Sequence, residues 1–265
     1  RDLNDKVSSA YLMVEPWKLL EALDKKMNSL NPNINKLAIK IMEEGPDLST
    51  DTDIANVPKG QPAVEHKLET DDIVTVWGPP GTGKTYTMAK IANSYIAQGK
   101  SVLIVSHSNV SVDGVIKQVV KMLGTDKQSI LEDGKILRFG YVRDDELSQN
   151  PYATSFNYAL SKCDSYARQL EHLMAKRDEL RAKNQMKSKE YDEVEHKIKE
   201  IRGEIRKEER KYVERAQVIG TTISRATIDP IFEERQFDLV MFDEVSMAYV
   251  PQVIAAAALA KEKFM

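Results

Sequence analysis

Cysteine and histidine are scarce in this sequence, and their scarcity excludes several classes of protein. Among 265 residues there is one cysteine, Cys163, so an internal disulfide framework is excluded. The four histidines are scattered, and no Cys/His spacing typical of a metal site is present. This composition fits a reducing, cytoplasmic location, which we take as the expectation.

Long apolar runs are also missing. No stretch approaches the roughly eighteen apolar residues that a membrane-spanning helix needs. The first ten residues lack the apolar core of a signal peptide. We therefore predict neither a membrane span nor an export signal. The sequence begins with Arg1 rather than methionine, which indicates a fragment.

Net charge is small as well. The formal charge is −3, so the whole-chain balance predicts no polyanion partner, although a local basic groove can be hidden in such an average. Hydrophobic residues make up 42% of the chain, which is enough to fill a sizeable core. The sequence is therefore typical of a globular protein.

The N-terminal part is predicted to be helical. Residues 11–30 and 33–44 have the spacing of two amphipathic helices, with an Asn-Pro break between them. The segment 45–62 is rich in Gly, Pro, Ser, Thr and Asp and is expected to be a loop or linker. We predict an N-terminal helical segment with its linker over 1–56 and a compact domain after it.

From residue 57 onward, short apolar strands alternate with helices. Helices are predicted after Lys84 and through 115–123. The expected strands are 73–77, 101–106, 136–140, 216–222 and 237–244. Such alternation is typical of an α/β fold in which a parallel sheet is covered by helices on both faces. The two parts of this domain are expected at 57–155 and 216–265.

A different kind of sequence, 156–215, separates these parts. It is highly charged, contains no proline and one glycine, and has apolar residues at intervals of three and four. The two apolar series are Leu160, Cys163, Ala167, Leu170, Met174, and Tyr191, Val194, Ile198, Ile201, Ile205, Tyr212. We predict an inserted antiparallel helical hairpin, coiled-coil-like, with its turn at 182–189. A solvated structural arm and a surface that touches nucleic acid or a partner both remain open as its role.

The stretch "GPPGTGKT" at 78–85 matches the phosphate-binding loop (P-loop). Glycines let the backbone N–H groups approach phosphate oxygens at the start of a helix. Lys84 is expected to reach the β- and γ-phosphates of ATP, and the Thr85 hydroxyl to hold Mg²⁺. The predicted nucleotide-binding residues of this motif are Gly78, Pro79, Pro80, Gly81, Thr82, Gly83, Lys84, Thr85 and Tyr86.

Hydrolysis requires carboxylates, and "FDLVMFDEVSM" supplies two of them at the end of an apolar strand. We predict that Asp243 is a Mg²⁺ ligand and that Glu244 orients or deprotonates the attacking water. With Lys84, these residues form the predicted catalytic set. The alternative is a strand-ending turn, because Asp-Glu pairs are common on protein surfaces.

These segments resemble the superfamily 1 helicases, specifically the nonsense-mediated-decay helicase group and its bacterial and viral relatives. The resemblance covers about residues 57–265 and rests on five segments in the family's order. They are "GQPAV", "GPPGTGKT", "SHSNVSVDGVI", "VIGTTISRA" and "FDLVMFDEVSMA". It implies a RecA-like P-loop fold, ATP and Mg²⁺ as ligands, and movement from 5′ to 3′ along single-stranded DNA or RNA. It also implies that Gln61 reads adenine, whereas Gln61 taken alone is more typical of an exposed loop.

The resemblance further implies two groups of residues that contact a single strand. They are Ser108, Asn109, Asp113, and Thr221, Thr222, Ser224. Their hydroxyl, amide and nearby backbone groups would touch the sugar-phosphate chain, which positions a strand without reading its sequence. Ser, Asn and Asp are also favoured caps of helices, so a purely structural role is the alternative.

The sequence departs from the family pattern in three places. His107 stands in place of the usual proline, and Met247 in place of a glutamine found in many members. The Gly-Asp motif and the second motor domain that the family leads us to expect next do not follow before Met265. The expected molecule is therefore the first half of a motor, able to bind ATP but nearly inactive in turnover by itself.

Two other functions remain as alternatives. A chromosome-organising or transporter-like ATPase also separates the P-loop from the Asp-Glu strand by a coiled-coil arm. That class requires a Ser-Gly-Gly motif shortly before the strand, and 216–236 does not contain one. The other alternative is a nucleotide-gated binding module without turnover, with the hairpin as its docking surface.

Overall fold

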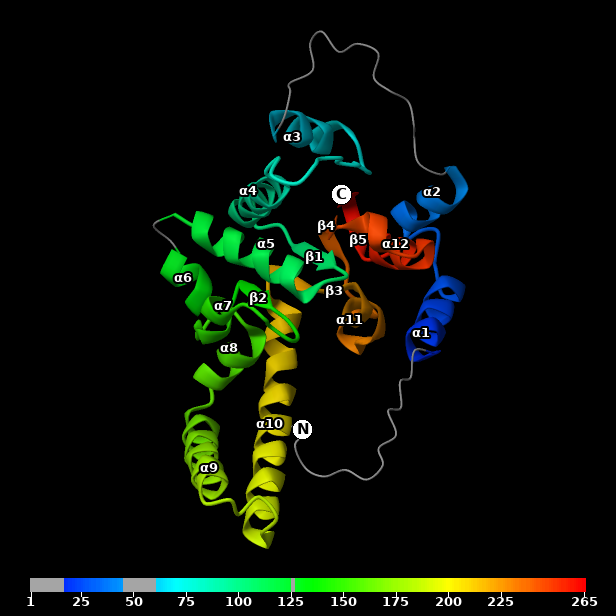
Figure 1. The fold of residues 1–265 in the computed structure, drawn as a ribbon. Coiled ribbons are helices and arrows are strands. Elements are labelled where there is room, and N and C mark those ends of the chain that lie inside the picture. The colour runs from blue at the N-terminus through cyan, green and yellow to red at the C-terminus, as the bar shows by residue number, and fades with distance from the viewer. Residues whose placement is uncertain (1–16, 45–60, 125–126) are drawn as a thin grey trace.

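The computed structural model describes residues 17–44, 61–124 and 127–265, and within them a five-stranded sheet in the order β2-β3-β1-β4-β5 (Figure 1). Every pairing of neighbouring strands is parallel. The strands are β1 (Val102–Ser106), β2 (Ile136–Arg138), β3 (Val218–Thr222), β4 (Phe237–Asp243) and β5 (Ala260–Phe264). The predicted α/β fold of the P-loop, RecA-like type is confirmed.

The strands are apolar because helices cover both faces of the sheet. All five residues of β1 are buried. Leu103 and Val105 belong to the hydrophobic core on one face, while Val102 and Ile104 belong to the core on the other. A strand buried on both faces cannot alternate apolar with polar residues, so it has a continuous apolar sequence.

One face carries the helices that follow the P-loop and β1. These are α4 (Lys84–Ala97) and α5 (Asn109–Met122), which pack on each other, with α3 (Gln61–Thr70) against α4. Gly220 in β3 permits the close approach of α5, because a Cβ there would lie 2.4 Å from Cγ1 of Ile116. Gly220 therefore lets α5 lie close against β3.

The opposite face is covered by α11 (Ile223–Ile228), α12 (Val250–Ala257) and the two N-terminal helices, α1 (Trp17–Asn28) and α2 (Lys36–Glu44). Leu37 and Ala38 of α2 are buried in the core of that face. The two N-terminal helices thus belong to the packed domain, whose core includes residues before 57. The remaining short elements are α6 (Lys127–Glu132), α7 (Asp145–Gln149), α8 (Ser155–Ser161), η1 (Pro230–Phe232) and η2 (Val245–Met247).

The strand predicted at 73–77 is wrong in extent. Its sequence favours a strand, but the structure has one bridge, between Ile73 and Phe264, with the Val74 N–H donating to the Phe264 carbonyl at 2.9 Å. The chain then leaves the sheet, and Trp77 is 88% exposed.

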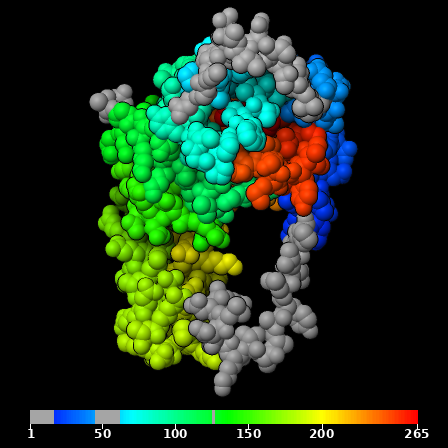
Figure 2. Space-filling model, turned by 45° about the horizontal axis from the view of Figure 1, so that its top comes forward, coloured from blue at the N-terminus to red at the C-terminus, as the bar shows by residue number. Residues whose placement is uncertain are grey.

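A pair of long antiparallel helices projects from the α/β domain (Figures 1 and 2). They are α9 (Asp164–Ala182) and α10 (Lys189–Arg215), joined by a turn at 183–188, inside the predicted turn. Both predicted apolar series contribute to the core between them, with Leu170, Val194, Ile198 and Ile205 buried. Cys163 instead lies between α8 and α9, so the first predicted series runs over two helices.

The helices of the hairpin are strongly charged on their outer faces.

None of the helices in the described parts of the chain combines the length and the apolar character required to cross a membrane.

Candidate nucleotide and single-strand site

Three strands end level with one another at one edge of the sheet. The parallel register places Ser106, the last residue of β1, opposite Thr222 of β3 and Asp243 of β4. The loops that follow these strands carry the predicted strand-contacting and acidic motifs. Ligands of open α/β sheets bind at the carboxyl ends of the strands, and this edge is therefore the candidate site.

The P-loop reaches the same region and has the backbone that its glycines allow. Gly81 and Gly83 have φ values of 83° and 85°, in the left-handed region that favours glycine. At Gly78 a Cβ would lie 2.6 Å from Oγ1 of Thr82, so a larger residue does not fit. The Thr82 hydroxyl donates to the carbonyl of Pro79 at 2.8 Å and closes the loop internally. The loop is thus a compact turn that leads directly into α4.

The P-loop and the acidic motif line one pocket of about 450 Å³. In Figure 2 the region of the P-loop (cyan) lies directly beside the segment after β4 (orange-red). Within the pocket region, the Lys84 ammonium donates to the Gly78 carbonyl at 2.5 Å. The lining residues are Pro79, Pro80, Gly81, Thr82, Gly83, Lys84, Thr85, Tyr86, Gln118, Asp243 and Glu244.

One glutamine that was not predicted lines the pocket, and the predicted Gln61 cannot be placed in it. Gln118 of α5 lines the pocket, and nothing in its local sequence distinguishes it from other helical glutamines. Gln61 is the first residue of α3, and its side chain lies outside the described part of the structure.

The two carboxylates differ in their surroundings. Asp243 is half-buried, and burial raises the pKa of its carboxyl, an effect to which the negative charge of Glu244 adds. The backbone N–H of Glu244 and the charge of Lys84 oppose this rise in the pKa of Asp243. Glu244 is exposed and has a left-handed backbone, with φ 57° and ψ 41°. That conformation costs a non-glycine residue roughly 1–2 kcal/mol and turns the chain sharply after Asp243.

These residues fit a nucleotide with a divalent cation. The loop has no side chain at Gly78, Gly81 or Gly83 to keep phosphates away from its N–H groups, and α4 begins at its end. The Thr85 hydroxyl and the Asp243 carboxylate line the same pocket, and hard oxygen ligands of this kind suit Mg²⁺. One or two protein oxygens with phosphate oxygens is the usual arrangement for Mg²⁺, in contrast to an all-protein cage.

The hydroxyls of two predicted strand-contacting residues cap helices. Ser108 precedes α5, and its Oγ accepts from the Val110 N–H at 3.2 Å. Thr222 precedes α11, and its Oγ1 accepts from the Arg225 N–H at 3.4 Å. Ser108 is exposed and Thr222 is half-buried. The capping role and an outward contact are therefore compatible.

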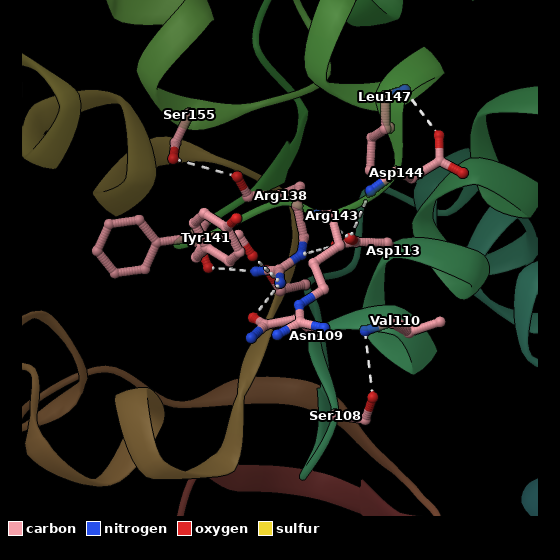
Figure 3. Close-up of polar contacts among 12 residues, drawn as sticks. Ser108, Asn109, Val110, Asp113, Arg138, Tyr141, Arg143, Asp144, Leu147 and Ser155 are labelled. Atoms are coloured by element: carbon pink, nitrogen blue, oxygen red, sulfur yellow. Dashed lines mark hydrogen bonds and ion pairs between the residues drawn. The ribbon is translucent and has the colours of Figure 1, made fainter. Parts of the chain in front are cut away.

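Asp113 lies in the interior and is part of a buried network (Figure 3). The residue is 1% exposed, and its Oδ1 accepts from Arg138 Nε at 2.6 Å. Its Oδ2 accepts from the backbone N–H of Arg143 at 2.7 Å. Arg138 Nη2 donates to Oδ1 of Asn109 at 2.8 Å. Asp113 therefore acts on the site indirectly, through Arg138 and the loop after β2. The sequence analysis did not predict a role for Arg138 or for this loop.

The other predicted strand-contacting residues are divided between interior and surface. Thr221 is fully buried, and its Oγ1 has no hydrogen-bond partner among the described residues. Asn109 and Ser224 are half-buried. The structure thus brings Ser108, Asn109 and Thr222 to the edge of the sheet and places Asp113 and Thr221 behind it.

Comparison with known proteins agrees with this geometry. The model of a family described as "AAA domain" matches residues 59–265, which include the P-loop, the whole sheet and the helical hairpin. The chain belongs to this AAA domain family. Its fold and its relatives support its assignment as a motor domain of the superfamily 1 type.

The relatives of this AAA domain are much longer proteins. DNA-binding protein SMUBP-2 of Mesocricetus auratus is 26% identical over 200 residues, 72% of this chain and 19% of the relative. DNA polymerase alpha-associated DNA helicase A of Saccharomyces cerevisiae is 25% identical, over 69% of this chain and 27% of its own length. Putative regulator of nonsense transcripts 1 of Takifugu rubripes is 28% identical, over 72% of this chain and 15% of its own length. The chain therefore spans about a fifth of the first of these relatives.

Proposed function

We propose that this AAA domain binds ATP with Mg²⁺ and is the nucleotide-binding half of a motor that moves 5′ to 3′ on single-stranded DNA or RNA. One observation supports this most strongly: residues of the P-loop and the Asp243–Glu244 pair, more than 150 positions apart in the sequence, line a single pocket. The proposed motor domain consists of 57–155 and 216–265, on which α1 and α2 also pack, with 156–215 as an inserted hairpin.

Each polar residue of the pocket has a separate proposed task. Lys84 binds the terminal phosphates, and its ammonium neutralises charge that develops on the γ-phosphoryl oxygens. Thr85 and Asp243 would hold Mg²⁺, which would supply positive charge beside the phosphates. Glu244 orients the attacking water and accepts its proton. Gln61 contacts the base of the nucleotide.

The strand is proposed to lie across the ends of β1 and β3. Ser108, Asn109 and Thr222 contact its sugar-phosphate chain, while Asp113 holds the loop after β2 from inside. Contacts to the backbone give binding without sequence preference that weakens steeply as salt is added.

Turnover is proposed to need a second motor domain. Phosphoryl transfer depends on positive charge around the γ-phosphate, and an arginine supplied from another domain contributes about 10³ to 10⁵ in rate in P-loop enzymes. Residues 1–265 alone are therefore expected to bind ATP and to hydrolyse it hardly at all.

Nucleotide binding is tested by thermal unfolding with and without ATP and Mg²⁺. A ligand that binds only the folded state raises the melting temperature, and Lys84→Ala is expected to abolish the rise. Lys90→Ala is the matched control, because Lys90 lies on the same helix and its Nζ pairs with Glu65 at 2.6 Å outside the pocket. An equal rise in the Lys84 variant would refute the assignment of the P-loop.

Turnover is tested by phosphate release from residues 1–265 and from a chain extended through a second motor domain, each with and without a single strand. We expect strand-stimulated release from the longer chain alone, and loss of release with retained ATP binding in its Glu244→Gln variant. Rapid, Glu244-dependent release by residues 1–265 would contradict the half-motor proposal and favour a self-sufficient ATPase.

A further inference from the structure

The loop after β2 is held from inside by one buried guanidinium. Arg138 is 0% exposed and donates to the backbone carbonyls of Phe139 at 2.6 Å and Tyr141 at 2.8 Å. The positive φ of Gly140, 115°, allows the chain to turn between these two carbonyls. Burying a charge with so many partners fixes the backbone that surrounds it, because each lost partner would leave a desolvated N–H.

Tyr141 presents its side chain to solvent from this fixed backbone. The residue is 70% exposed, although an aromatic ring normally contributes to folding through burial. In the described parts of the chain its hydroxyl has no hydrogen bond and its ring has no aromatic or cationic neighbour. The ring therefore adds little to the fold, while its backbone position is tightly determined.

The same nitrogen joins Tyr141 to the proposed strand contacts. Arg138 Nη2 donates both to the Tyr141 carbonyl and to Oδ1 of Asn109, each at 2.8 Å (Figure 3). The two acceptor oxygens are thus no farther apart than twice that distance. Because Oδ1 is taken by Arg138, the Nδ2 of Asn109 is left to donate to an acceptor such as a phosphate oxygen.

Positive charge lies beside the loop as well. The Arg225 guanidinium sits 4.0 Å from the centroid of the buried Phe139 ring and is 41% exposed. Its Cδ would be 3.3 Å from a Cβ at Gly140, the neighbour of Tyr141. Arg225 follows Thr222 by three residues in the capped first turn of α11. An exposed aromatic residue on a loop that also adjoins a phosphate donor and a cation is a combination that binds single strands.

We propose that Tyr141 is a base-stacking residue, on which one nucleobase of the strand bound at Asn109 and Thr222 lies. This inference rests on the proposed strand-binding function and adds a contact to a base where the motifs provide contacts to the backbone. Stacking tolerates every base, because each has a π-face, and so it leaves the binding without sequence preference.

The test compares a labelled oligothymidylate with an abasic strand of equal length at low salt, by fluorescence anisotropy. Tyr141→Ala is expected to weaken binding of oligothymidylate by about tenfold, within the range for one stacked base, and to leave the abasic strand unaffected. Tyr141→Phe should retain the affinity. The salt dependence should not change, because no phosphate contact is removed. Trp17→Ala, which removes a 49% exposed aromatic ring on α1, is the matched control.

Direct contact is tested by photo-crosslinking with a 5-iodouracil strand. We expect the crosslinked peptide to contain Tyr141. Crosslinks confined to other peptides, or an equal loss of both strands in Tyr141→Ala, would overturn the inference and leave strand binding intact. If the unaltered chain binds neither strand, both this inference and the strand-binding part of the proposed function fail. The ATP-dependent rise in melting temperature still tests the nucleotide site separately. Binding of oligothymidylate unchanged in Tyr141→Ala would assign the ring to another partner and also overturn the inference.

Discussion

Arg138 and Asp113 form an ion pair of 2.6 Å between a strand and a helix on one face of the sheet, and solvent reaches neither side chain appreciably. Arg138 ends β2, and Asp113 lies in the first turns of α5. The pair therefore joins the loop after β2 to the helix that follows β1. The two parts of the proposed strand-binding surface are fixed to each other through the interior.

Breaking this pair should be costly. Arg138→Met leaves the Asp113 carboxylate buried without its cation, and we expect a loss of about 3–5 kcal/mol in the free energy of unfolding. Lys117→Met removes the partner of Asp144, 3.0 Å away in a partly exposed pair, and should cost much less. Urea unfolding measures both. Equal losses in the free energy of unfolding for the two variants would show that burial does not make the Arg138–Asp113 pair more important for stability.

A second buried carboxylate predicts a dependence of stability on pH. Ser155 donates to Oε1 of Glu209 at 2.5 Å, in the contact between α8 and α10. Burial raises the pKa of Glu209; the hydrogen bond from Ser155 and the charges of Arg225 and Arg206 oppose the rise, and Asp229 adds to it. Because the folded-state pKa is above the unfolded one, this carboxyl favours folding at low pH. That contribution is lost as pH rises through the folded-state pKa.

Glu209→Gln removes the charge and keeps an oxygen that can accept from Ser155. The variant should be more stable than the unaltered chain at pH 7 to 8, and the difference should shrink as pH falls toward the ordinary glutamate pKa of about 4.3. Glu204→Gln, on the same helix, alters a surface pair with Lys207 at 2.7 Å and should give no comparable gain. Thermal unfolding across this pH range decides between them, and a gain that does not vary with pH would contradict the explanation.

The sequence predicted best what depends on neighbouring residues. The P-loop could be identified because its glycines and Lys84 act within one turn, and β1 and β4 because burial on both faces requires continuous apolar residues. The strand expected at 73–77 has equally suitable residues, but the structure has one bridge there, from Ile73 to Phe264 of β5. Local pattern contains no information on that partner.

The role of Asp113 could not be predicted from its local sequence either. From its place in the motif it could contact a strand, cap a helix or enter the core, and the choice depends on Arg138, 25 positions later. An arginine inside the apolar run "ILRFG" is the one signal in the sequence, because a charge in a buried strand requires a partner. Nothing comparable singles out Tyr141 or Gln118.

Two glycines should respond oppositely to the same substitution. Gly203 is inside α10 with nothing within 4 Å of an added Cβ, so Gly203→Ala should stabilise the chain by about 0.5–1 kcal/mol. Gly220→Ala would place its Cβ 2.4 Å from Ile116 and should destabilise by about 1–3 kcal/mol. Chemical unfolding of both variants tests the prediction. A loss of stability on Gly203→Ala would mean that α10 is not a regular helix there.

Because Glu244 has a left-handed backbone, we expect glycine to be more stable than alanine at this position, the reverse of the usual order. Glu244→Gly and Glu244→Ala both remove the carboxylate, and the glycine variant should be the more stable by about 1 kcal/mol, because only glycine adopts this region freely. At Glu233, with φ −67° and ψ −41°, alanine should instead be the more stable. Melting temperatures of the four variants check this. The same order at both positions would contradict the conformation assigned to Glu244.

The C-terminal end of α10 is tied to the sheet. Arg235 donates to the carbonyls of Val213 and Ala216, and β3 begins at Val218. The 27 residues of α10 extend about 40 Å from this fixed end. The helix is thus a lever whose pivot adjoins the strand that ends in Thr222. From that length, a tilt of about 10° at the pivot sweeps the turn at 183–188 through about 7 Å, so rotations too small to detect at the edge of the sheet become measurable displacements at Met186.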